Sequence, residues 1–262
     1  LIFPKLKIIN GKPDGRFPAH GPNPMAEGAM DELSKEVKKR KADLGVIFDA
    51  DGDRAFFVDD LGRPLQSSQA AFLISRGVRG ATVFDLLAGY LAEDLVSAGR
   101  KVFESRVGSY FMKKLMKEKK AKFGAETSGH YYFALRSLGE GGFYIDSGIL
   151  AAIQFMNQVS IIKHRGEKLS AWVDSLPKYY RSPELNFKIV DKSGMLKIAE
   201  EKYADQAESI SHLDGLKMEF DDWWFNLRPS NTEDLLRLNL EAKDERLYQQ
   251  KLSELETLLK KS

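Results

Sequence analysis

The sequence predicts an α/β protein that ends in a smaller α+β domain. Short apolar runs alternate with helical segments over residues 1–166, which is typical of sheets with crossover connections. Residues 180–262 instead combine several strands with two helices. Hydrophobic residues make up 43% and charged residues 30% of the 262, an ordinary globular composition that argues against wholesale disorder. A chain of this length is expected to hold about two domains of roughly 150 residues.

The first predicted block, residues 1–63, begins with a short apolar run and a loop rich in glycine and proline. Apolar residues at spacings of three and four predict its helix, and apolar runs bounded by turn residues predict its strands. The elements expected are a helix at 25–41, strands at 44–48 and 56–58, and a hairpin turn at 59–62.

The second predicted block, residues 64–166, alternates helices with short strands, so we expect a mostly parallel sheet. Its helices are expected at 69–76, 86–98, 110–119 and 148–158, and its strands at 81–84, 101–104, 122–124 and 130–134.

The third block, residues 180–262, follows a bridge around LPKYYR at 176–181. Its strands are expected at 186–190, 218–220, 224–227 and 235–241, and its helices at 195–203 and 245–260.

Charge and composition exclude several classes of protein. The 40 basic and 38 acidic residues leave a net charge of +2, which is too small to indicate nucleic-acid binding. The chain has no cysteine, which excludes disulfides and thiolate sites and fits a reducing, cytoplasmic compartment. No apolar run approaches the roughly 20 residues of a membrane helix.

An acidic loop, DADGDR at residues 49–54, follows the predicted strand 44–48. A tight turn at Gly52 would let Asp49, Asp51 and Asp53 converge, and such carboxylates repel one another unless a cation neutralises them. Oxygen ligands of this kind suit Mg²⁺, Mn²⁺ or Ca²⁺. The alternative is an acidic surface turn, although ligands in open α/β sheets bind where this loop lies, at the carboxyl end of a strand.

Two metal motifs can be compared with the acidic loop. An EF-hand starting at Asp49 fails, because Arg54 and Asp60 stand where glycine and glutamate are required. A haloacid-dehalogenase-type phosphatase fits better, since its strand ends in Asp-x-Asp. Asp49 would then be the nucleophile and Asp51 an acid/base, but no convincing second acidic pair follows downstream.

Two further loops carry polar groups. The motif ETSGH at 126–130 offers Glu126, Ser128 and His130 at alternate positions, which suits the hydroxyls of a sugar or a satisfied structural turn. The motif RPSNTE at 228–233 lies between two predicted strands. It reads either as a capped turn or as a phosphate site, whose donors would be Arg228, Ser230, Asn231 and Thr232.

In this order, the three loops resemble those of the α-D-phosphohexomutase family, the phosphomannomutases and phosphoglucomutases. They are similar to its metal-binding, sugar-binding and phosphate-binding loops, at domain-sized spacing. The flanking motifs FPAHGPNP at 17–24 and Val107-Gly108 also agree, so the resemblance covers essentially the whole chain.

The resemblance implies phosphohexomutase-type mixed-sheet α/β domains followed by an α+β domain. Residues 1–63 would be the later part of the second domain, 64–166 the third and 180–262 the fourth. It implies interconversion of hexose 6-phosphate and hexose 1-phosphate, of mannose or glucose, through a phosphoserine and a hexose 1,6-bisphosphate.

The resemblance also implies roles for individual residues. Asp49, Asp51 and Asp53 would hold Mg²⁺. Arg54 and His130 would act in catalysis, and Glu126, Ser128 and His130 would hold the sugar. The unreacting phosphate would be clamped by Arg228, Ser230, Asn231 and Thr232.

The sequence departs from the family at several positions. The phosphoserine loop is absent, Ser109 and Leu87 stand where relatives often carry histidine and lysine, and Asp234 stands where proline is common. We therefore expect a fragment that lacks the N-terminal part of the enzyme and is inactive alone. The alternatives are the phosphatase with Asp49 as nucleophile and a non-catalytic module that binds sugar phosphates.

Overall fold

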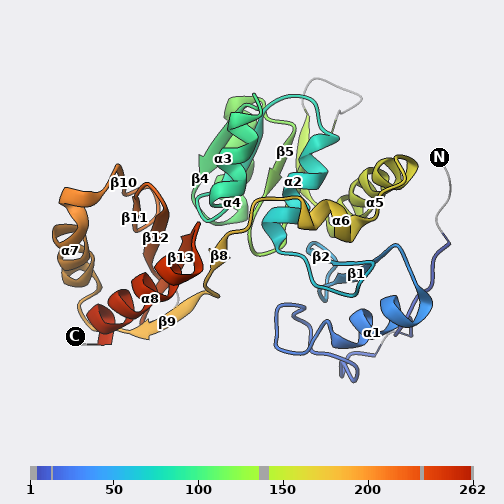
Figure 1. Cartoon of the computed structure of the whole chain (residues 1–262), viewed down its shortest axis with the longest axis horizontal. Helices are drawn as coiled ribbons and strands as arrows, with labels where there is room; N and C mark the ends of the chain where they lie inside the picture. Colours follow the sequence, from blue (N-terminus) through green and yellow to red (C-terminus); the bar gives the residue numbers. More distant parts are fainter. Residues whose placement is uncertain (1–4, 13, 136–141, 231–232, 261–262) are drawn as a thin grey trace. The chain divides into compact units, whose positions relative to one another are not determined.

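The computed structural model describes residues 5–12, 14–135, 142–230 and 233–260. By its internal contacts the chain divides into two units (Figure 1). Unit 1 comprises Leu1–Thr82 and Met116–Ser175, and unit 2 comprises Val83–Leu115 and Leu176–Ser262. The predicted domain bounds at 63, 166 and 180 do not coincide with this division and stay a prediction.

In the described part of the chain, unit 1 combines two groups of strands with four helices. Its elements are α1 (Asp31–Arg40), β1 (Leu44–Phe48), β2 (Ala55–Asp59), α2 (Ser67–Arg76), β5 (Phe123–Ala125), β6 (Tyr131–Leu135), β7 (Phe143–Asp146), α5 (Gly148–His164) and α6 (Leu169–Asp174). Two further elements, β3 (Thr82–Asp85) and α4 (Ser109–Lys119), contain the points at which the units divide.

The core of unit 1 forms where β2 meets α5. β1 and β2 pair antiparallel, with Phe48 opposite Ala55, so the acidic loop is the connection between two paired strands. Every residue of β2 is buried. Phe57 stacks on Phe155 with ring centroids 3.9 Å apart and meets the edge of Tyr131. This aromatic packing fixes the strands from which the polar loops emerge.

The sheet that carries the second polar loop differs from the parallel sheet expected. β5 pairs antiparallel with β6, and β6 pairs antiparallel with β7. Only five residues join β5 to β6, whereas a parallel pair needs a crossover of about a dozen residues or more. The expectation of a mostly parallel sheet was wrong for these strands, while the α/β class with mixed sheets is confirmed.

The turn after β2 is organised by one buried carboxylate. Asp59 is fully buried, and its Oδ1 accepts from the backbone N–H groups of Leu61 at 3.0 Å and Arg63 at 2.8 Å. Its Oδ2 accepts from Arg63 Nε at 2.7 Å. The hairpin turn expected at 59–62 is therefore present, and the Asp59 side chain accepts the hydrogen bonds that hold it.

Substituting Asp59 with alanine is expected to destabilise unit 1 by about 2–3 kcal/mol. The substitution leaves the backbone N–H groups of Leu61 and Arg63 without their acceptor, and it removes the Nε partner of Arg63, whose guanidinium keeps Asp174. Urea unfolding measures the change, and Asp31→Ala, in the first turn of α1, is the control. A loss for Asp59→Ala below that of the control would contradict this account of the turn.

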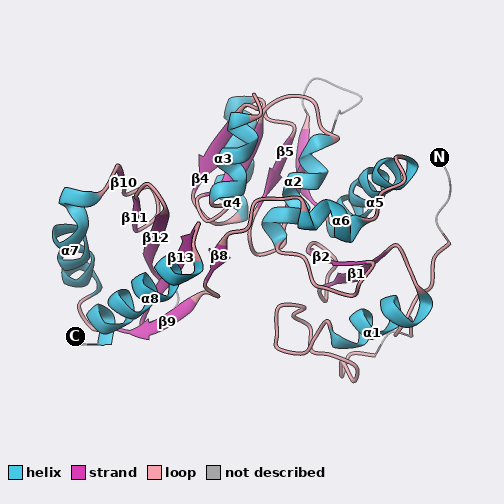
Figure 2. Ribbon diagram, viewed as in Figure 1, coloured by secondary structure: helices cyan, strands magenta, loops and turns pink. Residues whose placement is uncertain are grey.

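Within the described residues, unit 2 contains an antiparallel sheet and the helices α3, α7 and α8 (Figure 2). Its elements are most of β3, then α3 (Tyr90–Ser97), β4 (Val102–Ser105), β8 (Tyr180–Arg181), β9 (Leu185–Lys188), α7 (Lys192–Tyr203), a 3₁₀ turn (Ala204–Gln206), β10 (Ser209–Ser211), β11 (Leu216–Glu219), β12 (Trp223–Pro229), β13 (Leu235–Ala242) and α8 (Glu245–Lys260).

The two faces of the β12–β13 pair have opposite character. Alternate residues such as Phe225 and Leu238 enter an apolar core that also contains Tyr203 of α7 and Leu255 of α8. The other face carries three cross-strand polar pairs, which are Trp224 with Glu241, Asn226 with Asn239, and Arg228 with Arg237. The period of two along each strand produces this separation.

Several elements lie outside the sequence expectations. Among the described residues, β7, α6, β8 and β10 were not predicted. The helix predicted at 25–41 is shorter, since α1 is Asp31–Arg40, whereas α5 extends beyond its predicted end at residue 158. In the part of the chain that the structure describes, no helix has the length and apolar character needed to cross a membrane.

Candidate functional site

The acidic loop turns sharply directly after β1. Gly52 has φ +76°, a conformation that glycine adopts without the cost other residues incur. The turn brings carboxylate oxygens of Asp49, Asp51 and Asp53 within 4.8 Å of one another. The convergence expected from the sequence is therefore present in the structure.

Asp49 is the structural anchor of this loop. Its Oδ1 accepts from the backbone N–H groups of Gly52 at 3.2 Å and Arg54 at 3.1 Å, and its Oδ2 accepts from Arg54 Nε at 2.6 Å. Burial acts to raise the pKa of Asp49, but the hydrogen bonds from Arg54 lower it below its ordinary value. Asp49 is therefore an ionised carboxylate at neutral pH.

Asp53 has a different environment. Burial and the neighbouring charges of Asp49 and Asp51 raise its pKa, although His130 opposes this shift. Its Oδ1 is buried and has no hydrogen-bond partner among the described residues. A buried carboxylate oxygen without a donor is costly, and a cation would remove that cost. The donor set, the 4.8 Å convergence and this unpaired oxygen fit a hard divalent cation such as Mg²⁺.

The loop that contains Glu126, Ser128 and His130 is a tight connection between β5 and β6. The Glu126 N–H donates to the His130 carbonyl at 2.9 Å, and the Gly129 N–H donates to the Glu126 carbonyl at 3.0 Å. Glu126 is buried, and its Oε2 accepts from the Tyr132 hydroxyl. Ser128 Oγ lies 2.9 Å from His130 Nδ1. The three side chains are thus mutually oriented.

His130 joins this loop to the acidic loop. Its Nε2 lies 3.2 Å from Asp53 Oδ2, and its backbone forms a bridge with Arg54. The Ala55 N–H donates to the Gly129 carbonyl at 3.1 Å. The acidic loop and the loop at 126–130 therefore form one polar site in unit 1. They lie about 75 residues apart in sequence, so the site depends on long-range contacts.

The loop after β12 lies in unit 2. Arg228 Nη2 is 3.2 Å from Glu184 Oε2, and Ser230 Oγ accepts from the Glu233 N–H at 3.3 Å. Asn231 and Thr232, the other two predicted phosphate ligands, lie outside the described residues. Arg228 and Ser230 are brought together at one end of the β12–β13 pair.

Sequence reasoning missed two residues of these sites. Arg237 lies directly opposite Arg228, and its Nη2 is 3.3 Å from Ser230 Oγ. Tyr132 holds Glu126 and stacks on His130, with ring centroids 6.3 Å apart. The alternation of polar residues along 235–241 could have indicated Arg237. Tyr132 gave no such signal, because its place in an apolar run marked it as a core residue.

Family models match the chain in three consecutive segments. They describe phosphoglucomutase/phosphomannomutase alpha/beta/alpha domain II over residues 5–62, alpha/beta/alpha domain III over 81–180 and the C-terminal domain over 184–256. The chain belongs to the α-D-phosphohexomutase family. The resemblance and the phosphohexomutase-type fold expected from the sequence are thereby confirmed.

Individual relatives agree with this phosphohexomutase assignment. A phosphomannomutase of Methanocaldococcus jannaschii is 35% identical over 99% of this chain and 57% of its own length. A crystal structure of a phosphoglucomutase/phosphomannomutase family protein from Burkholderia thailandensis matches with a TM-score of 0.78 and 26% identity, over 94% of this chain and 53% of that one. This chain therefore spans little more than half the length of these relatives.

A more distant fold relative was solved with ligands. The N-acetylphosphoglucosamine mutase of Aspergillus fumigatus, in complex with GlcNAc-6P and magnesium, matches with a TM-score of 0.56 at 14% identity. The match covers 87% of this chain and 51% of that one, and it shows a shared fold.

Proposed function

We propose that this chain is the metal-, sugar- and phosphate-binding part of a phosphohexomutase that interconverts hexose 6-phosphates and hexose 1-phosphates of mannose or glucose. The observation that carries the proposal is the contact between His130 and Asp53, which unites the acidic loop and the Glu126–Ser128–His130 loop. Phosphoryl transfer depends on positioning and charge neutralisation, and this arrangement supplies groups for both.

Asp49, Asp51 and Asp53 would hold Mg²⁺, which when bound offsets negative charge on a transferring phosphate. Arg54 keeps Asp49 ionised, because its Nε lies 2.6 Å from Asp49 Oδ2. His130 contacts Asp53 through one ring nitrogen and Ser128 through the other. It can therefore orient a sugar hydroxyl or move a proton beside the cation site.

Glu126 and Ser128 would bind sugar hydroxyls. Because Tyr132 already donates to one Glu126 oxygen, the carboxylate is held in a fixed orientation before substrate arrives. Arg228, Ser230, Asn231 and Thr232 would bind the phosphate that does not react. Arg237 would add a second guanidinium, since it lies opposite Arg228 and within 3.3 Å of Ser230.

The remaining parts of the reaction are also proposals. A phosphoserine supplied from upstream sequence would transfer phosphate through a hexose 1,6-bisphosphate, with this chain inactive alone. The cytoplasmic location likewise stays a prediction.

Two measurements on this chain, hexose 6-phosphate binding and phosphate-ester hydrolysis, distinguish the mutase part from the phosphatase. We expect the chain to bind mannose 6-phosphate or glucose 6-phosphate in calorimetry without releasing inorganic phosphate. Hydrolysis of simple phosphate esters, with a hydroxylamine-sensitive acyl-phosphate at Asp49, would contradict the proposal and favour the phosphatase. The family membership does not favour that alternative.

We predict that Mg²⁺ binds this chain weakly. Asp49 already directs both oxygens at Arg54 and the backbone of its own loop, and no phosphoserine ligand is present in the sequence. Calorimetry with MgCl₂ is expected to give a dissociation constant of about 1 mM or weaker. Asp51→Asn should abolish the heat of Mg²⁺ binding. Asp43→Asn, which lies outside the loop, is the control and should leave that heat unchanged. Tight Mg²⁺ binding by the unsubstituted chain would overturn the prediction.

A further inference from the structure

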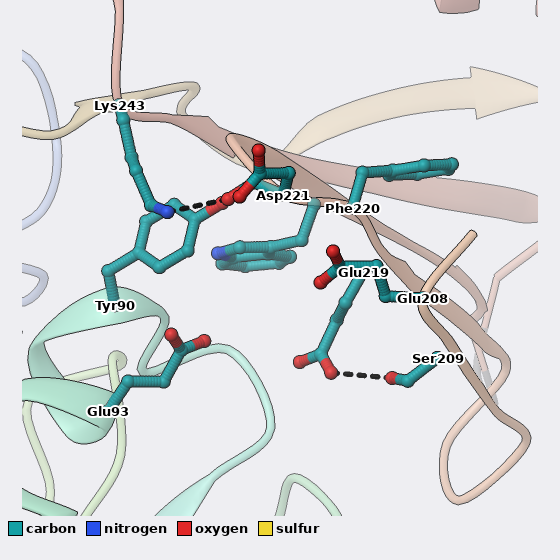
Figure 3. Close-up of a pocket in the computed structure, with 9 residues that line it drawn as sticks. Tyr90, Glu93, Glu208, Ser209, Glu219, Phe220, Asp221 and Lys243 are labelled. Atoms are coloured by element: carbon teal, nitrogen blue, oxygen red, sulfur yellow. Dashed lines mark hydrogen bonds between the residues drawn. The ribbon is translucent and has the colours of Figure 1, made fainter. Parts of the chain in front are cut away.

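Unit 2 contains a pocket of about 320 Å³ that is formed by residues other than the predicted ligands (Figure 3). Its wall includes the side chains of Tyr90 and Glu93 from α3 and of Trp224 from β12. A pocket of this volume admits a small organic ligand.

The aromatic part of the pocket is held rigidly. Glu241 is buried, and its Oε2 accepts from Trp224 Nε1 at 2.9 Å and from the Tyr90 N–H at 3.0 Å. One carboxylate on the polar face of the β12–β13 pair therefore holds the Trp224 ring and the backbone of Tyr90. Phe220 adds a third ring to the lining.

These rings already attract cations of the chain itself. Lys243 Nζ lies 5.0 Å from the centroid of the Tyr90 ring, and Lys217 Nζ lies 5.4 Å from that of Trp224. Aromatic faces attract ammonium groups most strongly where water is partly excluded. Tyr90 also packs against Tyr179 with ring centroids 5.0 Å apart, and Arg181 lies 5.7 Å from the Trp224 centroid, so groups of the chain already lie over both rings.

The charges around the pocket are not balanced. Four carboxylates line it, and Glu219 among them is paired with Lys217 at 2.7 Å. Within the described ranges, Glu93, Glu208 and Asp221 have no ion pair, since Lys243 contacts the carbonyl of Asp221 and the carboxylate of Asp222. The pocket therefore carries excess negative charge.

A buried hydroxyl in the wall has no partner. Tyr90 is 5% exposed, and its hydroxyl forms no hydrogen bond with the described residues. In Figure 3 the ring directs this hydroxyl toward the side of the pocket where Asp221 and Lys243 lie. An unpaired buried hydroxyl is costly, and a ligand that donates an N–H to its oxygen would remove the cost.

The spacing of the carboxylates argues against a metal ion. A metal site needs several carboxylate oxygens close together. Among the described residues, the acids that converge within 4.8 Å are Asp49, Asp51 and Asp53, and none of these lines the pocket. Dispersed carboxylates around aromatic rings suit an extended cation. We propose that this pocket binds a small aliphatic diamine or polyamine, through ionic contacts with Glu93 and Glu208, packing of its methylene chain against Tyr90 and Trp224, and an N–H donated to the Tyr90 hydroxyl oxygen.

Titration of the full chain with 1,4-diaminobutane, followed by tryptophan fluorescence and calorimetry, tests this proposal. We expect saturable binding of the diamine and none of butane-1,4-diol, which has the same length without charge. Glu93→Gln and Tyr90→Phe are expected to weaken binding about twofold to fivefold. The groups that these substitutions remove have no hydrogen bond or ion pair with the described residues, so circular dichroism should show both variants folded.

The matched control is Glu118→Gln, which removes an exposed carboxylate of α4 outside the pocket. It should bind the diamine as the unsubstituted chain does. Absence of saturable binding, equal binding of the diol, or unchanged affinity in both Glu93→Gln and Tyr90→Phe would each overturn the proposal. Equal weakening by Glu118→Gln would show nonspecific charge attraction and would also overturn it.

Discussion

Replacing Gly129 with alanine is expected to destabilise unit 1 by about 3 kcal/mol, from a left-handed backbone cost and steric overlap together. Gly129 has φ +90°, and a Cβ built there would lie 2.5 Å from the Phe56 ring. Phe56 is buried within β2 and has little room to move. The backbone of Gly129 must therefore shift, which breaks the hydrogen bond from Ala55 and separates His130 from Asp53.

Gly166→Ala is the matched control for this substitution. Gly166 also lies in unit 1 and has φ +80°, but nothing approaches a Cβ there within 4 Å. Gly166→Ala should lower the free energy of unfolding by about 1 kcal/mol, because only the backbone conformational cost applies there. Urea unfolding of both variants isolates the steric part, and equal losses for the two would contradict the close packing of the two loops.

Substituting Arg228 with alanine is expected to lower kcat/KM of the proposed mutase, tested with the upstream phosphoserine part that the proposal requires, by about 10- to 100-fold. Charge-assisted hydrogen bonds to a phosphate are worth about 1.5–3 kcal/mol. The phosphate that Arg228 would bind does not react, so the loss should appear mainly in KM. Steady-state assays with glucose 1-phosphate or mannose 1-phosphate measure it.

Arg246→Ala provides the comparison, since Arg246 is an exposed arginine of α8 in the same unit. Its kinetic constants should match those of the unsubstituted enzyme. A fall in kcat for Arg228→Ala at unchanged KM would contradict its assignment as a ligand of the unreacting phosphate.

The elements that sequence analysis predicted are those with strong local signals. β1 follows from the apolar run 44–48, and the Asp49 loop follows from alternating acids around a glycine. Helix α8 follows from its amphipathic period. In each case, residues close in sequence decide the local conformation.

The features that were missed depend on long-range pairing. The contact between Asp53 and His130 joins residues 77 positions apart. The position of Arg237 opposite Arg228 depends on the register of β12 and β13, which periodicity alone does not set. β7 pairs with β6 across residues 136–141, and its short run of four residues gave little signal of its own.

The most direct test of the central claim is mutase activity of this chain joined to the upstream phosphoserine part that the proposal requires. With glucose 1,6-bisphosphate as activator, the extended enzyme is predicted to convert mannose 1-phosphate or glucose 1-phosphate into the 6-phosphate. Asp51→Asn should abolish that activity. A folded, extended chain that binds hexose phosphate but shows no mutase activity would contradict the claim and identify a non-catalytic sugar-phosphate binding module.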